Sequence, residues 1–287
     1  MYSTDLLQGK SIIVTGGGSG LGLAMARAAV QHGAQVMICG RNEERLLKAV
    51  VEINRASNRS NAALAHRADV RQVDQVQALV NATVDAFGKV DGLINNAAGN
   101  FLCCSEDLTP NGFDAVTRIV LYGAVYCTLA VGRHLMERKA PGSIISILTT
   151  YIWTGSAYVL PSACAKAGVL AMTRSLAVEW GSLGIRLNAI APGGIPTEGA
   201  WSRLMAGEEV EADARRRVPL GRWGTKEEIA NSALFLLSDL SSYQTGDVIT
   251  MDGGSWLAAG GQFSHYRFLP KDKLKEKMEA MKSKSRE

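Results

Sequence analysis

The chain has 287 residues, enough for one large domain, with 47% hydrophobic and 20% charged residues and a formal net charge of +4. The positive excess lies mainly in Arg215–Arg217 and the lysine-rich C-terminus. We interpret it as solvated surface, with attraction of an anionic substrate as a weaker alternative. Nucleic-acid binding would need a basic stripe interleaved with aromatic residues, and the sequence has none.

Cysteines and terminal segments indicate the compartment. There are five cysteines, an odd number without a C-x-x-C pair, which indicates reduced thiols and neither a disulfide framework nor a metal site. Residues 1–10 have no apolar run typical of a targeting peptide. No apolar segment reaches the roughly 20 residues that cross a bilayer. We therefore expect a cytoplasmic protein without a membrane partner, most simply a bacterial one.

A glycine-rich turn follows the first expected strand, residues 11–15, and opens a helix that runs to Gly33. Glycines permit positive φ and leave no Cβ in the way of a phosphate, while free N–H groups at the helix start favour a pyrophosphate. Strand, turn and helix in this order predict a dinucleotide site. Its residues are Gly16, Gly17, Gly18, Ser19, Gly20, Leu21 and Gly22.

The end of the second expected strand, residues 35–39, selects the cofactor. A carboxylate there would bind the ribose 2′-OH of NAD, whereas an arginine pairs with the 2′-phosphate of NADP. The sequence reads Cys39-Gly40-Arg41 and has no carboxylate. Arg41 therefore favours NADP(H), and the alternative is a surface arginine that starts the next helix.

The remaining chain alternates strands and helices. We expect strands over 62–66, 90–94, 143–148, 185–190 and 247–251, and helices over 72–87, 111–138, from near 162 to 183, and over 225–238. This alternation predicts an α/β fold, a single-domain, Rossmann-like, doubly wound parallel sheet with helices on both faces. The domain spans residues 1–254, with a polar segment 197–218 that we interpret as a lid or, alternatively, a solvated excursion. Residues 255–287 form a C-terminal extension of the same domain.

Taken together, these residues resemble the short-chain dehydrogenase/reductase family. The resemblance lies in the glycine turn, Asp69-Val70, residues 95–99, Lys166, and the loop from Pro192 to Thr197. Three positions depart from the family pattern. Ser162 stands where the family has its catalytic tyrosine, Thr149 where it has a serine, and Tyr122 where it has an asparagine in the long fourth helix.

The departures resemble one branch of that family, the 2,4-dienoyl-CoA reductases with a mitochondrial-type active site. The resemblance implies an NADP(H) cofactor, an acyl-CoA substrate and a homotetramer. It implies cofactor binding by the glycine turn with Arg41, Asp69, Val70, Asn96, Ala97, Lys166, Pro192, Gly193, Gly194, Ile195 and Thr197. It implies substrate binding by Arg41, Arg71, Phe101, Thr109, Tyr151 and Arg203. Catalysis is implied for Tyr151, Asn100, Lys166 and Ser162.

The residues themselves favour the same chemistry. A serine hydroxyl is too weak an acid to replace a phenol, so ketone reduction through position 162 is disfavoured. Reduction of a conjugated thioester instead collects charge on the thioester oxygen, where preorganised donors stabilise it. Tyr151 and Asn100 are the candidate donors, and proton return at the α carbon gives a 3-enoyl product.

Other interpretations stay open. Tyr151 is alternatively a packed aromatic, Asn100 a loop-capping amide and Ser162 a helix N-cap. The chain is alternatively a reductase of another carbonyl or enoyl thioester compound, or a catalytically silent NADP-binding protein that acts through association.

Overall fold

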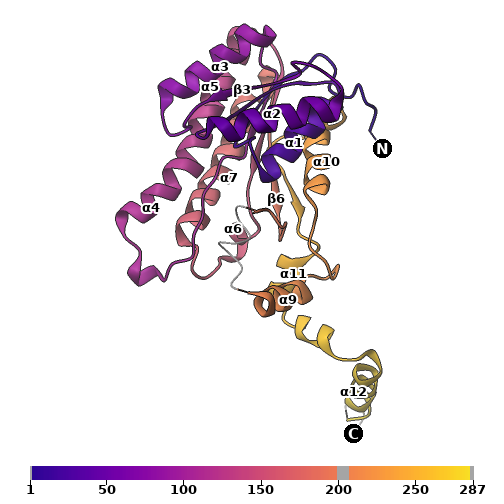
Figure 1. Cartoon of the computed structure of the whole chain (residues 1–287). Helices are drawn as coiled ribbons and strands as arrows, with labels where there is room; N and C mark the ends of the chain where they lie inside the picture. The colour runs from indigo at the N-terminus through magenta and orange to yellow at the C-terminus, as the bar shows by residue number, and fades with distance from the viewer. Residues whose placement is uncertain (1, 199–206, 285–287) are drawn as a thin grey trace.

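The computed structural model describes residues 2–198 and 207–284, and its centre is one parallel sheet (Figure 1). Seven strands lie in the order β3-β2-β1-β4-β5-β6-β7, and every neighbouring pair is parallel. The predicted doubly wound sheet is confirmed. The strand order reverses between β1 and β4, where the carboxyl ends of the strands leave a crevice for a ligand. The strands are β1 (Ser11–Thr15), β2 (Gln35–Gly40), β3 (Ala63–Arg67), β4 (Gly92–Asn95), β5 (Gly142–Ile147), β6 (Ile185–Pro192) and β7 (Val248–Met251).

Helices cover both faces of this sheet. Side chains of α1, α2 and α10 pack on one face, and those of α3, α5 and α7 pack on the other. The helices up to the middle of the chain are α1 (Gly20–Gln31), α2 (Glu43–Ser57), α3 (Val73–Phe87), α4 (Pro110–Thr117), α5 (Gly123–Glu137), α6 (Tyr151–Thr154) and α7 (Leu160–Trp180). The later ones are α9 (Glu208–Arg217), α10 (Lys226–Leu237), α11 (Ser255–Gly260) and α12 (Lys271–Lys284). Short turns are η1 (Ser105–Asp107), η2 (Arg118–Tyr122), η3 (Gly181–Leu183), η4 (Asp239–Ser241) and η5 (Ser264–Phe268).

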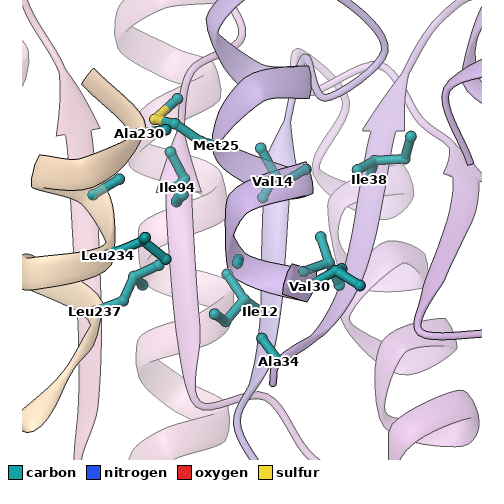
Figure 2. Close-up of a cluster of buried hydrophobic side chains, with 14 of the residues drawn as sticks. Ile12, Val14, Met25, Val30, Ala34, Ile38, Ile94, Ala230, Leu234 and Leu237 are labelled. Carbon is teal, nitrogen blue, oxygen red and sulfur yellow. The ribbon is translucent and has the colours of Figure 1, made fainter. Parts of the chain in front are cut away.

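Burial on both faces explains the apolar strands. Ile12 and Val14 point into the core under α1 and α10, and Ile13 between them points into the core under α3 and α5. Figure 2 shows the first of these cores, where Met25 of α1 and Leu234 of α10 meet the strands. A strand buried on both faces reads as a continuous apolar run, which is why the first strand was visible in the sequence.

One helix prediction needs correction. The helix between β5 and β6 begins at Leu160, with Val159 as its N-cap residue, so Ser162 lies inside the first turn and is not an N-cap. The long helix predicted over 111–138 is confirmed as the rod Pro110–Glu137, in which the π-helical turn η2 joins α4 to α5 without interrupting the helical backbone. Helix α10 also begins as predicted, since Thr225 and Glu228 form a capping box at its N-terminus.

The expectation that no apolar segment could span a membrane was also wrong by length and composition. The rod Pro110–Glu137 is long and apolar enough, and it is the only such helix among residues 2–198 and 207–284. Half of its apolar window is buried within the protein, however. We interpret it as a core helix, because α5 packs on the sheet and α4 packs on α7.

Helix α11, in the last part of the chain, lies beside α9 of the predicted lid. Of the predicted lid 197–218, residues 199–206 lie outside the described part, and the remainder contains α9. Helix α11 packs against both α9 and α6, while α12 extends away from the body of the protein (Figure 1). The residues after 254 therefore first pass beside α6 and then extend away from the sheet.

Candidate active site

The glycine turn lies at the carboxyl end of β1, in the crevice of the sheet. Gly16 has φ of +65°, and its N–H donates to the Cys39 carbonyl at 2.8 Å. A Cβ on Gly22 would lie 2.5 Å from the Nδ2 atom of Asn96, so only glycine fits there. Ser19 precedes α1 without a side-chain cap, which leaves the first N–H groups of the helix available for a phosphate. This cradle fits a dinucleotide.

Thr15 joins the glycine turn to the loop after β4. Its hydroxyl oxygen accepts the N–H groups of Asn96 at 2.9 Å and Ala97 at 3.0 Å, and its hydroxyl donates to the Ile94 carbonyl at 3.3 Å. The Nδ2 atom of Asn96 donates back to the Thr15 carbonyl at 3.0 Å. Asn96 and Ala97 thus lie where cofactor binding was predicted. Thr15 was not among the predicted site residues, although a hydroxyl at the end of an apolar strand was the available signal.

The loop after β6 closes the other side of the cradle. The N–H of Gly193 donates to the Met251 carbonyl at 3.0 Å, which fixes the loop to β7. Gly194 lies against the Trp223 ring, and Ile195 is buried in the core under α10. The Thr197 side chain lies 3.6 Å from the place of a Cβ on Gly20. The predicted segment from Pro192 to Thr197 therefore reaches the glycine turn.

Basic side chains gather at the end of β2, and the segment contains no carboxylate before α2 begins. Arg41 directly follows β2, and the Nε atom of Arg67 donates to its carbonyl at 3.3 Å. The Arg45 side chain lies beside Gly18, 3.4 Å from the place of a Cβ there. This arrangement suits a 2′-phosphate better than a 2′-hydroxyl. Arg45 and Arg67 were not predicted, and nothing but their charge marked them.

Asp69 and Arg71 pair with each other. The two side chains form an ion pair at 2.5 Å, and a second hydrogen bond joins them at 2.9 Å. Through this hydrogen bond Arg71 holds the pKa of the Asp69 carboxyl below its usual value. Arg71, predicted to bind substrate, is thus engaged by Asp69 in this structure. Val70 between them is buried and packs against Gly123 at the start of α5.

The structure brings three of the four predicted catalytic residues together. The hydroxyl of Tyr151, at the start of α6, lies 2.8 Å from the hydroxyl of Ser162 in the first turn of α7. Lys166 lies one turn further along α7, and its ammonium donates to the Ile147 carbonyl at the end of β5. Burial lowers the pKa of Lys166 to about 8. A phenol, a hydroxyl and a buried ammonium thus share one corner of the crevice.

Asn100, the fourth predicted catalytic residue, lies on the loop after β4. The carboxamide oxygen of Asn100 accepts the Phe101 N–H at 3.0 Å, which leaves the amide N–H₂ as the donor for a substrate. The N–H of Cys103 donates to the Tyr158 carbonyl at 3.0 Å, which ties this loop to the segment between α6 and α7.

The predicted substrate residues are placed less uniformly. Phe101 packs beside the core under α4 and α7. The Thr109 hydroxyl caps α4 by accepting the Gly112 N–H at 3.1 Å, so in this structure it has a structural partner. Arg203 lies outside the described residues. Within residues 2–198 and 207–284, no group of three or more His, Cys, Asp or Glu side chains could hold a metal ion.

Comparisons with known proteins match most of the chain. The family model described as enoyl-(acyl carrier protein) reductase matches residues 16–255. A probable 2,4-dienoyl-CoA reductase of Bacillus subtilis, named as (2E)-enoyl-CoA-producing, is 49% identical over 252 residues, covering 88% of this chain and 98% of that protein. The peroxisomal 2,4-dienoyl-CoA reductase of Rattus norvegicus, named as (3E)-enoyl-CoA-producing, is 41% identical over 262 residues, covering 90% of this chain and 87% of that protein. A crystal structure of a short chain dehydrogenase from Bacillus anthracis superposes with a TM-score of 0.80 at 44% identity, covering 87% of this chain and 97% of that one.

Proposed function

The chain belongs to the short-chain dehydrogenase/reductase family of oxidoreductases, and from that premise we propose that it reduces 2,4-dienoyl-CoA thioesters with NADPH. The observation that carries the proposal is the Tyr151–Ser162 hydrogen bond of 2.8 Å beside the buried Lys166. This hydrogen bond supports the hypothesis that Tyr151 replaces the catalytic tyrosine that the family has at position 162, because the Tyr151 hydroxyl reaches the side chain at that position. Relatives named 2,4-dienoyl-CoA reductase support the substrate class.

The proposed cofactor is NADPH. Bound NADPH supplies a hydride to the substrate. The glycine turn, whose cradle a Cβ at Gly22 would fill, suits its pyrophosphate. Arg41 suits its 2′-phosphate, and Lys166 suits the nicotinamide ribose. The absence of a carboxylate between β2 and α2 supports NADPH over NADH, since the acceptor that would bind a 2′-hydroxyl is missing there.

The proposed chemistry places charge on the thioester oxygen. As hydride reaches the far end of the diene, the electron pair moves through the conjugated bonds and the thioester becomes an enolate. Tyr151 donates its O–H and Asn100 its N–H to that oxygen, where donors fixed in advance stabilise the developing charge. Ser162 holds the Tyr151 hydroxyl in place. The Lys166 ammonium, still mostly protonated at neutral pH, adds a nearby positive charge.

The position of the returning proton decides the product. Protonation at the α carbon gives a 3-enoyl thioester, and protonation at the γ carbon gives a 2-enoyl thioester. We propose the 3-enoyl product, because the donors on the thioester oxygen hold the negative charge next to the α carbon. The relatives carry both names, since the Bacillus subtilis protein is named for the 2-enoyl product and the rat protein for the 3-enoyl product.

A substrate panel tests the proposal. NADPH oxidation is measured with a 2,4-dienoyl-CoA, a 3-ketoacyl-CoA and a 2-enoyl-CoA, and the product of the diene is identified by NMR. We expect turnover of the diene alone, with a double bond at carbon 3. Tyr151→Phe and Asn100→Ala should each lower kcat by roughly 10²–10³ without a comparable change in NADPH affinity. Rapid turnover of the ketoester with none of the diene would contradict the proposal.

The assembly and the location are part of the same proposal. Large apolar side chains are exposed on the surface, among them Val178 on α7 at 87% and Tyr243 after η4. Exposed apolar residues are compatible with association, and by analogy with the family we propose a homotetramer. We also propose a cytoplasmic location, which the Bacillus relative supports. Sedimentation at equilibrium checks the first part, and a monomer would contradict it.

A further inference from the structure

The short helix that carries Tyr151 cannot be stable by itself. Helix α6 has four residues, starts after Thr150 without a side-chain cap, and ends at Gly155, which has φ of +72°. A single helical turn is unfavourable in isolation, because nucleation costs more than one turn of hydrogen bonds returns. The position of the Tyr151 hydroxyl therefore depends on what α6 packs against.

Successive side chains of α6 make three different contacts. Tyr151 hydrogen-bonds Ser162 at 2.8 Å, and Ile152 packs beside the core under α4 and α7. The ring of Trp153 meets the ring of Trp256, with centroids 5.1 Å apart and planes tilted by 38°. Trp256 belongs to α11, which packs between α6 and α9. The side of α6 away from the core is thus held by an aromatic residue from the C-terminal extension.

Trp256 is itself fixed to the sheet. The carboxylate of Asp252, which directly follows β7, accepts the N–H of Gly254 at 2.8 Å and the N–H of Trp256 at 2.7 Å. Asp252 is 9% exposed, so this cap is sheltered from water. A continuous series of contacts therefore runs from the end of β7 through Trp256 and Trp153 to Tyr151.

We propose that Trp256 is a positioning residue for Tyr151, and that its contact with Trp153 keeps the phenol at hydrogen-bonding distance from Ser162. The proposal rests on the proposed function, because it assumes that the Tyr151 hydroxyl acts on the substrate. It gives residues 255–260 a role in the reaction itself. Without the Trp153–Trp256 contact, α6 is free to turn about Ile152 and the phenol leaves the crevice for part of the time.

Kinetics test the proposal through a double-mutant comparison. In the wild-type background, Trp256→Ala should lower kcat about three- to tenfold, the scale of one aromatic pair, and leave the KM for NADPH unchanged. Trp256→Phe should restore most of the loss. In the Tyr151→Phe background, Trp256→Ala should change kcat less than twofold, because the group it positions is gone. An equal fall in both backgrounds, or an effect confined to the KM for NADPH, would overturn the proposal.

Phe263 provides the matched control. Its exposed ring lies in the same extension and pairs with Tyr266, 6.5 Å away, beyond the end of α11. Phe263→Ala should leave kcat within twofold of wild type. A loss as large as that of Trp256→Ala would mean that any damage to the extension lowers activity, and it would also overturn the proposal.

A structural measurement separates this proposal from the proposed function. In a crystal structure of the Trp256→Ala variant, we expect α6 displaced and the Tyr151–Ser162 hydrogen bond lost. An unchanged α6 with the bond retained would overturn the positioning role, whatever the substrate. If wild-type enzyme does not turn over the dienoyl thioester but the variant shows the displacement, the proposed function fails and the positioning of Tyr151 by Trp256 stands.

Discussion

Replacing Thr15 by valine removes one hydroxyl and keeps the shape of the side chain. The two N–H groups of Asn96 and Ala97 then lose the acceptor that binds them at 2.9 and 3.0 Å. A buried donor left without a partner costs about 1–3 kcal/mol. Both residues are only partly buried, so water recovers some of this loss. We expect the free energy of unfolding to fall by about 2–4 kcal/mol, which corresponds to roughly 3–7 °C in Tm for a chain of 287 residues.

Thr83 provides the control for this prediction. It is also fully buried, and its hydroxyl donates to the Leu79 carbonyl at 2.7 Å within α3. Thr83→Val leaves no N–H group unpaired, so its cost should stay below about 1 kcal/mol. Urea and thermal unfolding measure both variants, and Thr15→Ser should recover most of the loss. Equal losses for Thr15→Val and Thr83→Val would refute the reasoning, because the accepted N–H groups would then carry no special weight.

Two further predictions concern charge. Arg41→Asp should weaken NADPH binding about ten- to a hundredfold and NADH binding far less, since it replaces a donor to the 2′-phosphate with a like charge. Titration of both cofactors measures the two affinities, and Arg55→Asp at the far end of α2 is the control. Equal losses of affinity for NADPH and NADH would count against the role of Arg41. Lys166 has its pKa lowered by burial from an ordinary 10.5 to about 8. Its charged form therefore destabilises the cofactor-free fold fully below pH 8, and this destabilisation disappears as the pH rises from 8 to 10.5. We compare the unfolding free energy of wild type with that of Lys166→Met. The difference, wild type minus variant, should rise by up to about 1.4 kcal/mol per pH unit between pH 8 and 10.5. A difference that stays constant with pH would contradict the assignment of a buried, charged Lys166.

The fold could be predicted from the sequence because local patterns determine it. Strands such as residues 11–15 are buried on both faces and read as apolar runs, and the glycine turn and the Thr225 cap mark where helices begin. Boundaries were less certain. The start of α7 at Leu160 was marked only by Pro161 in its first turn, because Val159 is not a usual capping residue.

The site was predicted only as far as single residues carry a recognisable chemistry. Tyr151 and Lys166 stood out as a phenol and an amine near a glycine turn, and the structure brings both to Ser162. The pairing of Arg71 with Asp69 was missed, because a charged side chain in a sequence does not show which partner it prefers. The contact of Trp153 with Trp256 joins residues far apart in the chain, and only the folded sheet brings them together.

The π-helical turn η2 gives the long rod one place where a change in chain length can be absorbed. A π turn accommodates one residue more than the regular helix around it. Deleting one residue within Arg118–Tyr122 is therefore expected to convert this turn into regular α-helix and to leave α4 and α5 near their present orientation. Each residue turns an α-helix by about 100°, so the same deletion in the regular part of α5, before Cys127, would rotate α4 against the rest of α5 by about that angle. Val116 would then leave its place beside α7 while Cys127 kept its place on the sheet.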